Sequence, residues 1–211
     1  MATLSSYITA CRRLLHDANG NFYSDQLLTT YINDARARVV RDTGCLRALQ
    51  ADAVYLNQEV YTFDTLPKGS RTIDCLNINL YWGNTRIPLR YLPWTQFNAE
   101  LRFWQNYVGR PIAFSMYGPK SYYISPVPDQ TYAIELDTVY LPVDLVSDSD
   151  VDEITDPYTS LPPWYACYKA KYFEQSFGEA EIFKNEYQKQ ALSVLNTTFT
   201  RRMPNPYSTP Y

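Results

Sequence analysis

The sequence predicts an α+β protein in which an N-terminal and a C-terminal helical hairpin pack together, with a β-rich insertion between them and an extended C-terminal arm. Three observations predict this class. Near both ends of the chain, apolar residues recur every three or four positions, which is the period of an amphipathic helix. In the middle the period changes to two, which is the period of a strand. Prolines then crowd into the last residues, where they exclude both helix and sheet.

The N-terminal hairpin begins with a helix over Thr3–Ala18, which the turn residues Asp17–Gly20 bring to an end. Ser24 is a good N-cap for a second helix, and Asp25 places a negative charge in its first turn, where the helix dipole favours it. This second helix ends near Gly44. The apolar positions that define the two helices are Leu4, Ile8, Cys11, Leu15, Leu28, Tyr31, Ile32, Ala35, Val39 and Val40.

The β-rich segment opens with short strands at Val54–Leu56 and Val60–Phe63. Thr72–Trp82 alternates apolar and polar residues, and Gly83–Asn84 makes a hairpin turn into a returning strand over Thr85–Leu89. Antiparallel strands at this spacing predict a small sandwich or rolled sheet. The remaining expected strands are Pro111–Tyr117, Ser121–Ser125 and Thr131–Leu141.

One short helix interrupts the strands, at about residues 93–108. Pro93 opens it, since proline suits the first turn of a helix, and Gly109 closes it. Its expected buried side consists of Phe97, Leu101 and Trp104.

Helical spacing returns after a linker that is acidic and rich in turn residues. One helix ends near Gly178, and a second covers Glu179 to about Phe199. We therefore divide the chain into a helical hairpin (1–50), the β-rich insertion (51–145), the acidic linker (146–163), a second helical hairpin (164–200) and the arm (201–211).

The charge balance argues against binding to nucleic acid phosphates. The net charge is −3, and no clustered basic face is evident. Arg36, Arg38 and Arg41 alternate with Asp34 and Asp42, which is typical of a solvated helix face. The 20 tyrosines suit either a protein interface or a core whose hydroxyls reach its rim, and composition does not separate the two.

The chain lacks the residues of the common catalytic sites, so we expect no enzyme. His16 is the only histidine, and at the end of a helix it fits a solvated or capping role. No nucleophile elbow and no glycine-rich phosphate loop is present. Glu135 and Asp137 share one face of a strand, a spacing that could serve glycoside hydrolysis but is also common on solvated strand faces.

Neither a metal nor a cofactor is expected. The four cysteines are scattered, without the paired spacing of a zinc site. The run Asp148–Glu153 starts like a calcium loop, but Glu153 stands where the loop needs glycine and Thr159 where it needs glutamate. A solvated linker is the favoured interpretation of this run.

No membrane contact is expected either. The first residues are too polar for a signal peptide, and no apolar run approaches 18 residues. We expect a chain made in the cytoplasm with reduced thiols.

Two aromatic clusters, Tyr122–Tyr123 and Trp164–Tyr165, could stack on bases or sugars. Since they have no basic companions, a place in the core or in a subunit interface is favoured.

The arm is unusually aromatic for a terminal segment. Prolines reduce the entropy lost on docking, and aromatic and arginine side chains often anchor interfaces. We expect it to lie in a groove of another subunit; a frayed end is the alternative. The candidate docking residues are Phe199, Arg201, Arg202, Met203, Pro204, Pro206, Tyr207 and Tyr211.

Two passages carry a resemblance to a known family. The first consists of Arg13–Asp17, Asn21–Asp25, Leu28, Tyr31–Ala35 and Arg38–Thr43, and the second of Gly109–Pro111, Tyr117–Gly118, Tyr122, Pro126–Asp129, Tyr132 and Leu136. In their order and spacing they resemble the head-to-tail adaptor (head completion or neck) proteins of short-tailed bacteriophages and their prophage relatives. The order of helical hairpin, β insertion and closing helices agrees over most of the chain.

The resemblance implies a structural virion protein, made in the host cytoplasm and placed in the neck or tail. Such adaptors form a homo-oligomeric ring, usually of twelve copies, beneath the portal protein, and present a platform to the tail nozzle or tube. The ring extends the channel for DNA ejection, and DNA passes without sequence-specific binding. By this resemblance the arm would bind the portal, and the acidic balance would let DNA slide without sticking.

Two alternatives stay open. A tail-tube or nozzle subunit would share the virion and the ring but not the portal contact. A carbohydrate- or peptide-binding module built on the β-rich segment is the more remote alternative.

Overall fold

The structure is a computed structural model that describes residues 2–102 and 107–200, with the side chains of residues 199 and 200 left out. By their contacts the residues form two compact units. The helical unit comprises Met1–Leu46 and Pro142–Tyr211, and the β unit comprises Arg47–Leu141. Helices and sheets are both present, so the predicted α+β class is confirmed. Within the described residues, no helix combines the length and the apolar character needed to cross a membrane.

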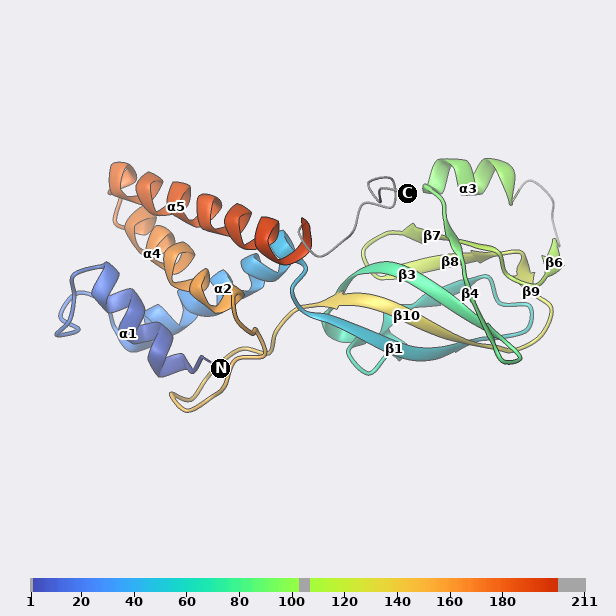
Figure 1. Ribbon diagram of the computed structural model, residues 1–211, viewed down its shortest axis with the longest axis horizontal. Coiled ribbons are helices and arrows are strands. Elements are labelled where there is room, and N and C mark those ends of the chain that lie inside the picture. Colours follow the sequence, from blue (N-terminus) through green and yellow to red (C-terminus); the bar gives the residue numbers. More distant parts are fainter. Residues whose placement is uncertain (1, 103–106, 201–211) are drawn as a thin grey trace, which may run out of the picture. The chain divides into compact units, whose positions relative to one another are not determined.

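The described part of the helical unit contains four α-helices, and α4 contacts each of the other three (Figure 1). Their shared core includes Leu4 and Ile8 of the first helix, Leu28 and Ile32 of the second, and Cys167 of the fourth. The elements are α1 (Leu4–Leu14), α2 (Asp25–Thr43), η3 (Tyr158–Ser160), α4 (Pro162–Phe173), α5 (Phe177–Leu195) and η4 (Asn196–Thr200).

Caps explain where the first two helices begin and end. The Thr3 hydroxyl accepts a hydrogen bond from the backbone N–H of Ser6, and the Ser6 hydroxyl accepts one from the N–H of Thr3. Ser24 caps α2 as predicted, and Gly44 ends it in the left-handed conformation at φ 62°. The first helix ends at Leu14 and not at Ala18, because the chain leaves the helix at His16, whose φ is 56°.

In its described residues, the β unit contains two four-stranded sheets and one small pair of strands. The first sheet has the order β1 (Arg47–Val54), β10 (Tyr132–Tyr140), β3 (Thr72–Trp82), β4 (Thr85–Pro88), and is antiparallel throughout. The second has the order β2 (Val60–Thr62), β8 (Ser121–Ser125), β7 (Ala113–Tyr117), β5 (Arg90–Tyr91). The pair is β6 (Val108–Gly109) with β9 (Val127–Pro128), and two short turns of helix are η1 (Phe63–Thr65) and η2 (Gly69–Arg71).

The two larger sheets of the β unit share one hydrophobic core. Ile78 and Ile134 come from the first sheet, and Phe114, Tyr122 and Ile124 from the second; all five are essentially inaccessible to solvent. Alternate residues of β3 and β10 supply this core, as expected for strands with one buried face. The arrangement is a small sandwich of two sheets.

Further elements differ from the sequence prediction. Gly178, expected near the end of a helix, lies in the first turn of α5, because α4 already ends at Phe173. The helix expected at residues 93–108 is only α3 (Trp94–Glu100); Val108–Gly109 forms a strand, because its backbone pairs with Val127–Pro128. Trp104, expected on the buried side of that helix, lies outside the described residues. Strand β1 starts seven residues before Val54, since its pairing with β10 overrides the weak strand preference of its alanine-rich sequence.

Candidate functional site

A buried polar cluster connects three parts of the helical unit that are far apart in the sequence. Arg36 of α2 donates a hydrogen bond from Nη2 to Oδ1 of Asp152, at 2.5 Å. Tyr7 of α1 donates from its hydroxyl to Oδ2 of the same carboxylate, at 2.7 Å. Arg36 also donates to the carbonyl oxygen of Val143 at 2.8 Å and to Oδ1 of Asn33 at 3.0 Å. The cluster thereby holds the segment that follows the β unit against α1 and α2.

The electrostatics of this cluster favour a structural role. The side chains of Arg36 and Asp152 are almost fully buried, so each charge depends on the other for its compensation. Burial, the hydrogen bond to Asp152 and the charge of that carboxylate together raise the pKa of Tyr7. The Tyr7 hydroxyl therefore stays protonated and acts as a permanent hydrogen-bond donor. With its charges already paired, the cluster is suited to holding chain segments together and not to binding a ligand.

This cluster corrects one interpretation of the sequence and refines another. Arg36 does not lie on a solvated helix face but is fully buried, whereas the neighbouring Arg38–Asp42 pair is exposed. The acidic run is exposed at most of its residues, as expected of a solvated segment, but it is also anchored to the helical unit. Asp152 is buried, and the carboxylate of Asp150 accepts hydrogen bonds from the backbone N–H groups of Val146 and Ser147. Carbonyl groups of this run also accept hydrogen bonds from the first N–H groups of α1.

A second buried carboxylate organises the loop between α1 and α2. The Asp17 side chain accepts hydrogen bonds from the backbone N–H groups of Asn21 at 2.9 Å and of Tyr23 at 3.0 Å. Arg12 donates to it at 3.3 Å and to Asp25 at 2.6 Å. Burial alone would disfavour the Asp17 charge, but these backbone hydrogen bonds and the Arg12 guanidinium hold its pKa below the usual range. The loop is thus fixed from within by an ionised carboxylate.

The loop that Asp17 organises presents Phe22 to solvent. This side chain is 83% exposed, the highest value among the large hydrophobic side chains that the structure describes. More apolar surface lies on the C-terminal hairpin of the same unit, where Phe173, Phe177, Ile182 and Leu192 are exposed. Exposed apolar side chains in such number are typical of a surface that meets another protein.

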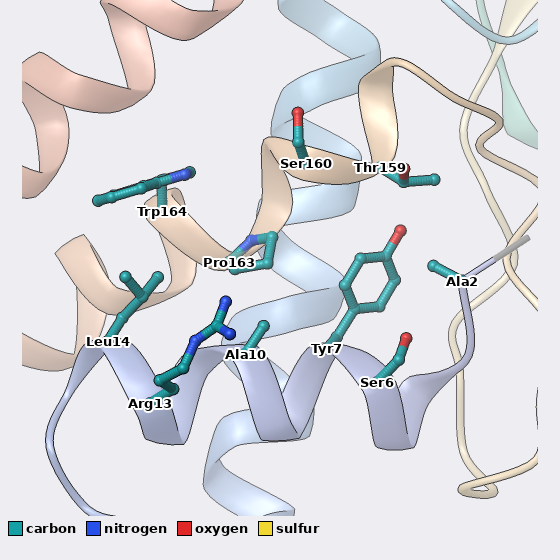
Figure 2. Close-up of a pocket in the computed structure, with 10 residues that line it drawn as sticks. All are labelled: Ala2, Ser6, Tyr7, Ala10, Arg13, Leu14, Thr159, Ser160, Pro163 and Trp164. Atoms are coloured by element: carbon teal, nitrogen blue, oxygen red, sulfur yellow. The ribbon is translucent and has the colours of Figure 1, made fainter.

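A groove of about 340 Å³ runs between α1 and the start of α4 (Figure 2). The α1 side contributes the small residues Ser6 and Ala10, together with Arg13. Pro163 and Trp164 close the other side. An apolar groove with few polar groups at its margin is suited to receive a protein side chain or a short segment.

The β unit carries an aromatic surface of its own. The ring of Trp94 lies 4.5 Å from the ring of Tyr117 and 4.7 Å from the ring of Tyr123, measured between centroids. The guanidinium of Arg102 lies over Trp94 and Tyr123 and pairs with Glu59 at 2.6 Å. This cluster is half-buried and forms a second candidate contact surface.

The weaker candidate sites of the sequence have structural partners. Glu135 of β10 pairs with Arg86 of β4, across the intervening β3, and Asp137 pairs with Arg47 of the neighbouring β1, so both carboxylates belong to ion pairs within the first sheet. Tyr122 is fully buried in the sandwich core and offers no stacking surface. In the part of the chain that the structure describes, no group of three or more His, Cys, Asp or Glu side chains could hold a metal ion.

The candidate docking residues of the arm fall at or beyond the end of the part of the chain that the structure describes. Phe199 falls in η4, where its side chain is not described. The other seven, Arg201, Arg202, Met203, Pro204, Pro206, Tyr207 and Tyr211, lie outside the described residues.

Three features did not follow from the sequence: the buried pair of Arg36 and Asp152, the exposed Phe22 side chain and the groove. A signal for Arg36 was present, because it lies four residues after Ile32 and four before Val40, on the apolar stripe of α2. No comparable signal marks Asp152 or the groove, since both depend on segments that meet only in the folded chain.

Comparisons with known proteins agree with a role in assembly. Curated protein sequences gave no significant match. A family model described as SU10 adaptor protein matches residues 2–210, which is almost the whole chain. The chain therefore belongs to the SU10 adaptor protein family, whose members are structural adaptor proteins of the bacteriophage virion.

Proposed function

We propose that the chain is a head-to-tail adaptor that forms a ring, most simply a dodecamer, between the portal protein and the tail nozzle or tube. The ring extends the channel through which DNA is ejected. The observation that carries this proposal is the match of the adaptor family over residues 2–210. Synthesis in the host cytoplasm, before assembly into the neck, belongs to the same proposal.

The surface of the chain supports a role in assembly. The helical unit exposes Phe22, Phe173, Phe177 and Ile182, which a monomer would leave in water. The β unit exposes aromatic side chains around Trp94. A protein with two such surfaces can contact one partner with its helical unit and another with its β unit.

The charge of the chain supports the channel role. A net charge of −3 leaves no electrostatic attraction for the DNA backbone as a whole. Fixed negative charge around a channel repels phosphate groups and lets the duplex slide. DNA therefore passes without sequence-specific binding.

The arm is the proposed portal contact. Phe199, Arg201, Arg202, Met203, Pro204, Pro206, Tyr207 and Tyr211 combine the side chains that anchor interfaces with prolines that restrict the free segment. The extended reach of eleven residues is roughly 36 Å, enough to cross the contact surface of a neighbouring protein.

Imaging of the purified chain mixed with its portal protein tests the proposal. We expect a ring that caps the portal in negative-stain electron micrographs. A ring that binds the tail protein and ignores the portal would favour the tail-tube or nozzle alternative. A monomer that binds glycans and neither virion protein would contradict the adaptor.

Replacement of residues 201–211 by a Gly/Ser segment of equal length tests the arm. We expect a folded chain that no longer docks on the portal, because the residues that the structure describes already form a hydrophobic core in each unit. A matched variant in which only Ser208 and Thr209 become glycine should dock normally. Docking that survives the full replacement would show that the portal contact lies elsewhere.

A further inference from the structure

Phe22 has the properties of a preformed anchor. It is 83% exposed, yet the backbone on both sides of it is bound to the buried Asp17 carboxylate, through the N–H groups of Asn21 and Tyr23. The ion pair between Asp17 and Arg12 fixes the loop to α1. A side chain presented on an ordered loop loses little entropy when it docks, which favours binding.

The groove between α1 and α4 has the size and the lining that an aromatic ring needs. Its volume is about 340 Å³, and an apolar cavity of roughly 150 Å³ already holds a benzene ring. Ser6 and Ala10 lie one helical turn apart on α1, so their small side chains leave the middle of the groove open (Figure 2). Pro163 and Trp164 supply apolar surface opposite them.

The charges beside Phe22 (the knob) and beside the groove are complementary. Arg13 lines the groove, and within the described chain its guanidinium forms no ion pair or hydrogen bond. None of the described residues that line the groove carries a carboxylate. Three residues after Phe22, the Asp25 side chain is 69% exposed and uses only one of its oxygens, Oδ1, to pair with Arg12. The Arg13 guanidinium can therefore meet both an aromatic ring and a carboxylate of the docking loop.

We propose that Phe22 of one copy inserts into the α1–α4 groove of the next copy, and that this knob-in-groove contact links neighbours in the ring. The contact joins two different surfaces of the same helical unit, and such head-to-tail contacts generate rings when the rotation closes. The proposal rests on the ring of the proposed function and names the surfaces that build it. Because Phe22 is exposed in its own chain, it does not occupy its own groove and stays available to a neighbour.

Two variants remove the two halves of the contact. Phe22→Asp removes the knob, and Ala10→Trp fills the groove with the variant's own side chain. We expect each to weaken self-association by about 30-fold or more, the scale of an interface hot spot. Arg13→Glu should weaken self-association less, because this substitution changes only the margin of the groove. Val146→Asp is the matched control: Val146 is 80% exposed on another loop of the same unit and should leave association unchanged.

Mixing the two variants distinguishes this contact from general loss of folding. The Phe22→Asp chain keeps an intact groove, and the Ala10→Trp chain keeps an intact knob. One productive contact can then form per pair, so the mixture should yield dimers that cannot grow into rings. Native mass spectrometry over a range of concentrations measures these species, with circular dichroism to establish that each variant is folded.

The same measurements, made on each chain by itself and on each chain mixed with the portal protein, separate this inference from the adaptor proposal. Wild-type rings, variant monomers and mixed dimers support the knob-in-groove contact. Rings from Phe22→Asp would overturn it and leave the adaptor proposal standing. A folded Ala10→Trp chain that still forms rings would do the same. A wild-type chain that stays monomeric both alone and with the portal overturns both.

Discussion

Each unit has its own hydrophobic core, but the two units differ in where their ion pairs lie. In the helical unit, the segment that returns from the β unit contributes Leu145 to the core and is also joined to α1 and α2 by polar contacts, among them the buried ion pair of Arg36 with Asp152. In the β unit, the ion pairs Arg47–Asp137 and Arg86–Glu135 are partly exposed. Stability there comes from a core that two sheets share.

The difference follows from how each unit is connected. Strands of the β unit pair along their length, so many backbone hydrogen bonds and side-chain contacts together hold them in place. The helical unit must join α1 and α2 to a segment more than a hundred residues later in the chain. A few directed polar contacts do this, so the loss of a single one should have a larger local effect.

The largest effect is expected from Asp152→Ala. It leaves the guanidinium of Arg36 buried without a counter-charge, a change that costs about 3–5 kcal/mol. We expect thermal unfolding to show a helical transition at much lower temperature while the β-unit transition is unchanged. The exposed Asp148, whose side chain makes no ion pair in the described structure, provides the control variant Asp148→Ala.

A double-mutant cycle sharpens this test. Arg36→Met combined with Asp152→Leu should cost less than the sum of the two single changes, because neither charge is then left unpaired. Additive costs would mean that the two side chains act independently, which would contradict the role assigned to the pair.

A smaller effect is expected from Ile134→Ala in the β unit. Ile134 is fully buried between the sheets. Removal of its side chain leaves a cavity, which lowers the free energy of unfolding by about 2–4 kcal/mol. We expect the β-unit transition to shift while the helical transition stays in place. Leu49→Ala, on an exposed position of β1, is the control and should change little. If both transitions moved together, the two units would not unfold separately and the comparison would fail.

The smallest effect is expected from pH and concerns the loop that carries Phe22. Desolvation opposes the Asp17 charge, but the hydrogen bonds from Tyr23, Asn21 and Phe22 and the charge of Arg12 lower its pKa in the folded state. A lowered folded pKa contributes stability that is present above the unfolded value of about 3.9 and is lost as pH falls through the folded value.

Hydrogen exchange at different pH values measures this contribution. Above pH 5 we expect slow exchange at the amides of Asn21 and Tyr23 in the wild type and faster exchange in Asp17→Asn. As the pH falls below about 3.9, the gap between the two proteins should narrow. A gap that stays constant down to pH 2 would mean that the Asp17 charge does not order the loop.

Local signals in the sequence predicted much of the fold. Ser24 and Gly44 bound α2 where their capping chemistry places them. Period-two alternation located β3, and the turn at Gly83–Asn84 located its hairpin with β4. Each of these rests on contacts between residues close in the sequence, which is why a sequence pattern can reveal them.

Other features could not be predicted from the sequence, for a physical reason. Strand β1 reads poorly as a strand, because its buried Gln50 is acceptable only where Nε2 meets the Thr138 hydroxyl at 2.6 Å and Oε1 accepts from the Lys68 N–H at 2.8 Å. The helix predicted at 93–108 was too long, because the backbone of Val108 pairs with that of Val127 in a β-strand. In both cases a partner distant in the sequence decides the local conformation.

The sequence by itself therefore determined the α+β class, the principal caps and turns, and, through its resemblance, the adaptor family. Only the tertiary structure decided which charges are buried, which aromatic side chain stands exposed and where a groove opens. Periodicity and capping depend on neighbours along the chain, whereas the Arg36–Asp152 pair, the Phe22 knob and the α1–α4 groove depend on segments that folding brings together.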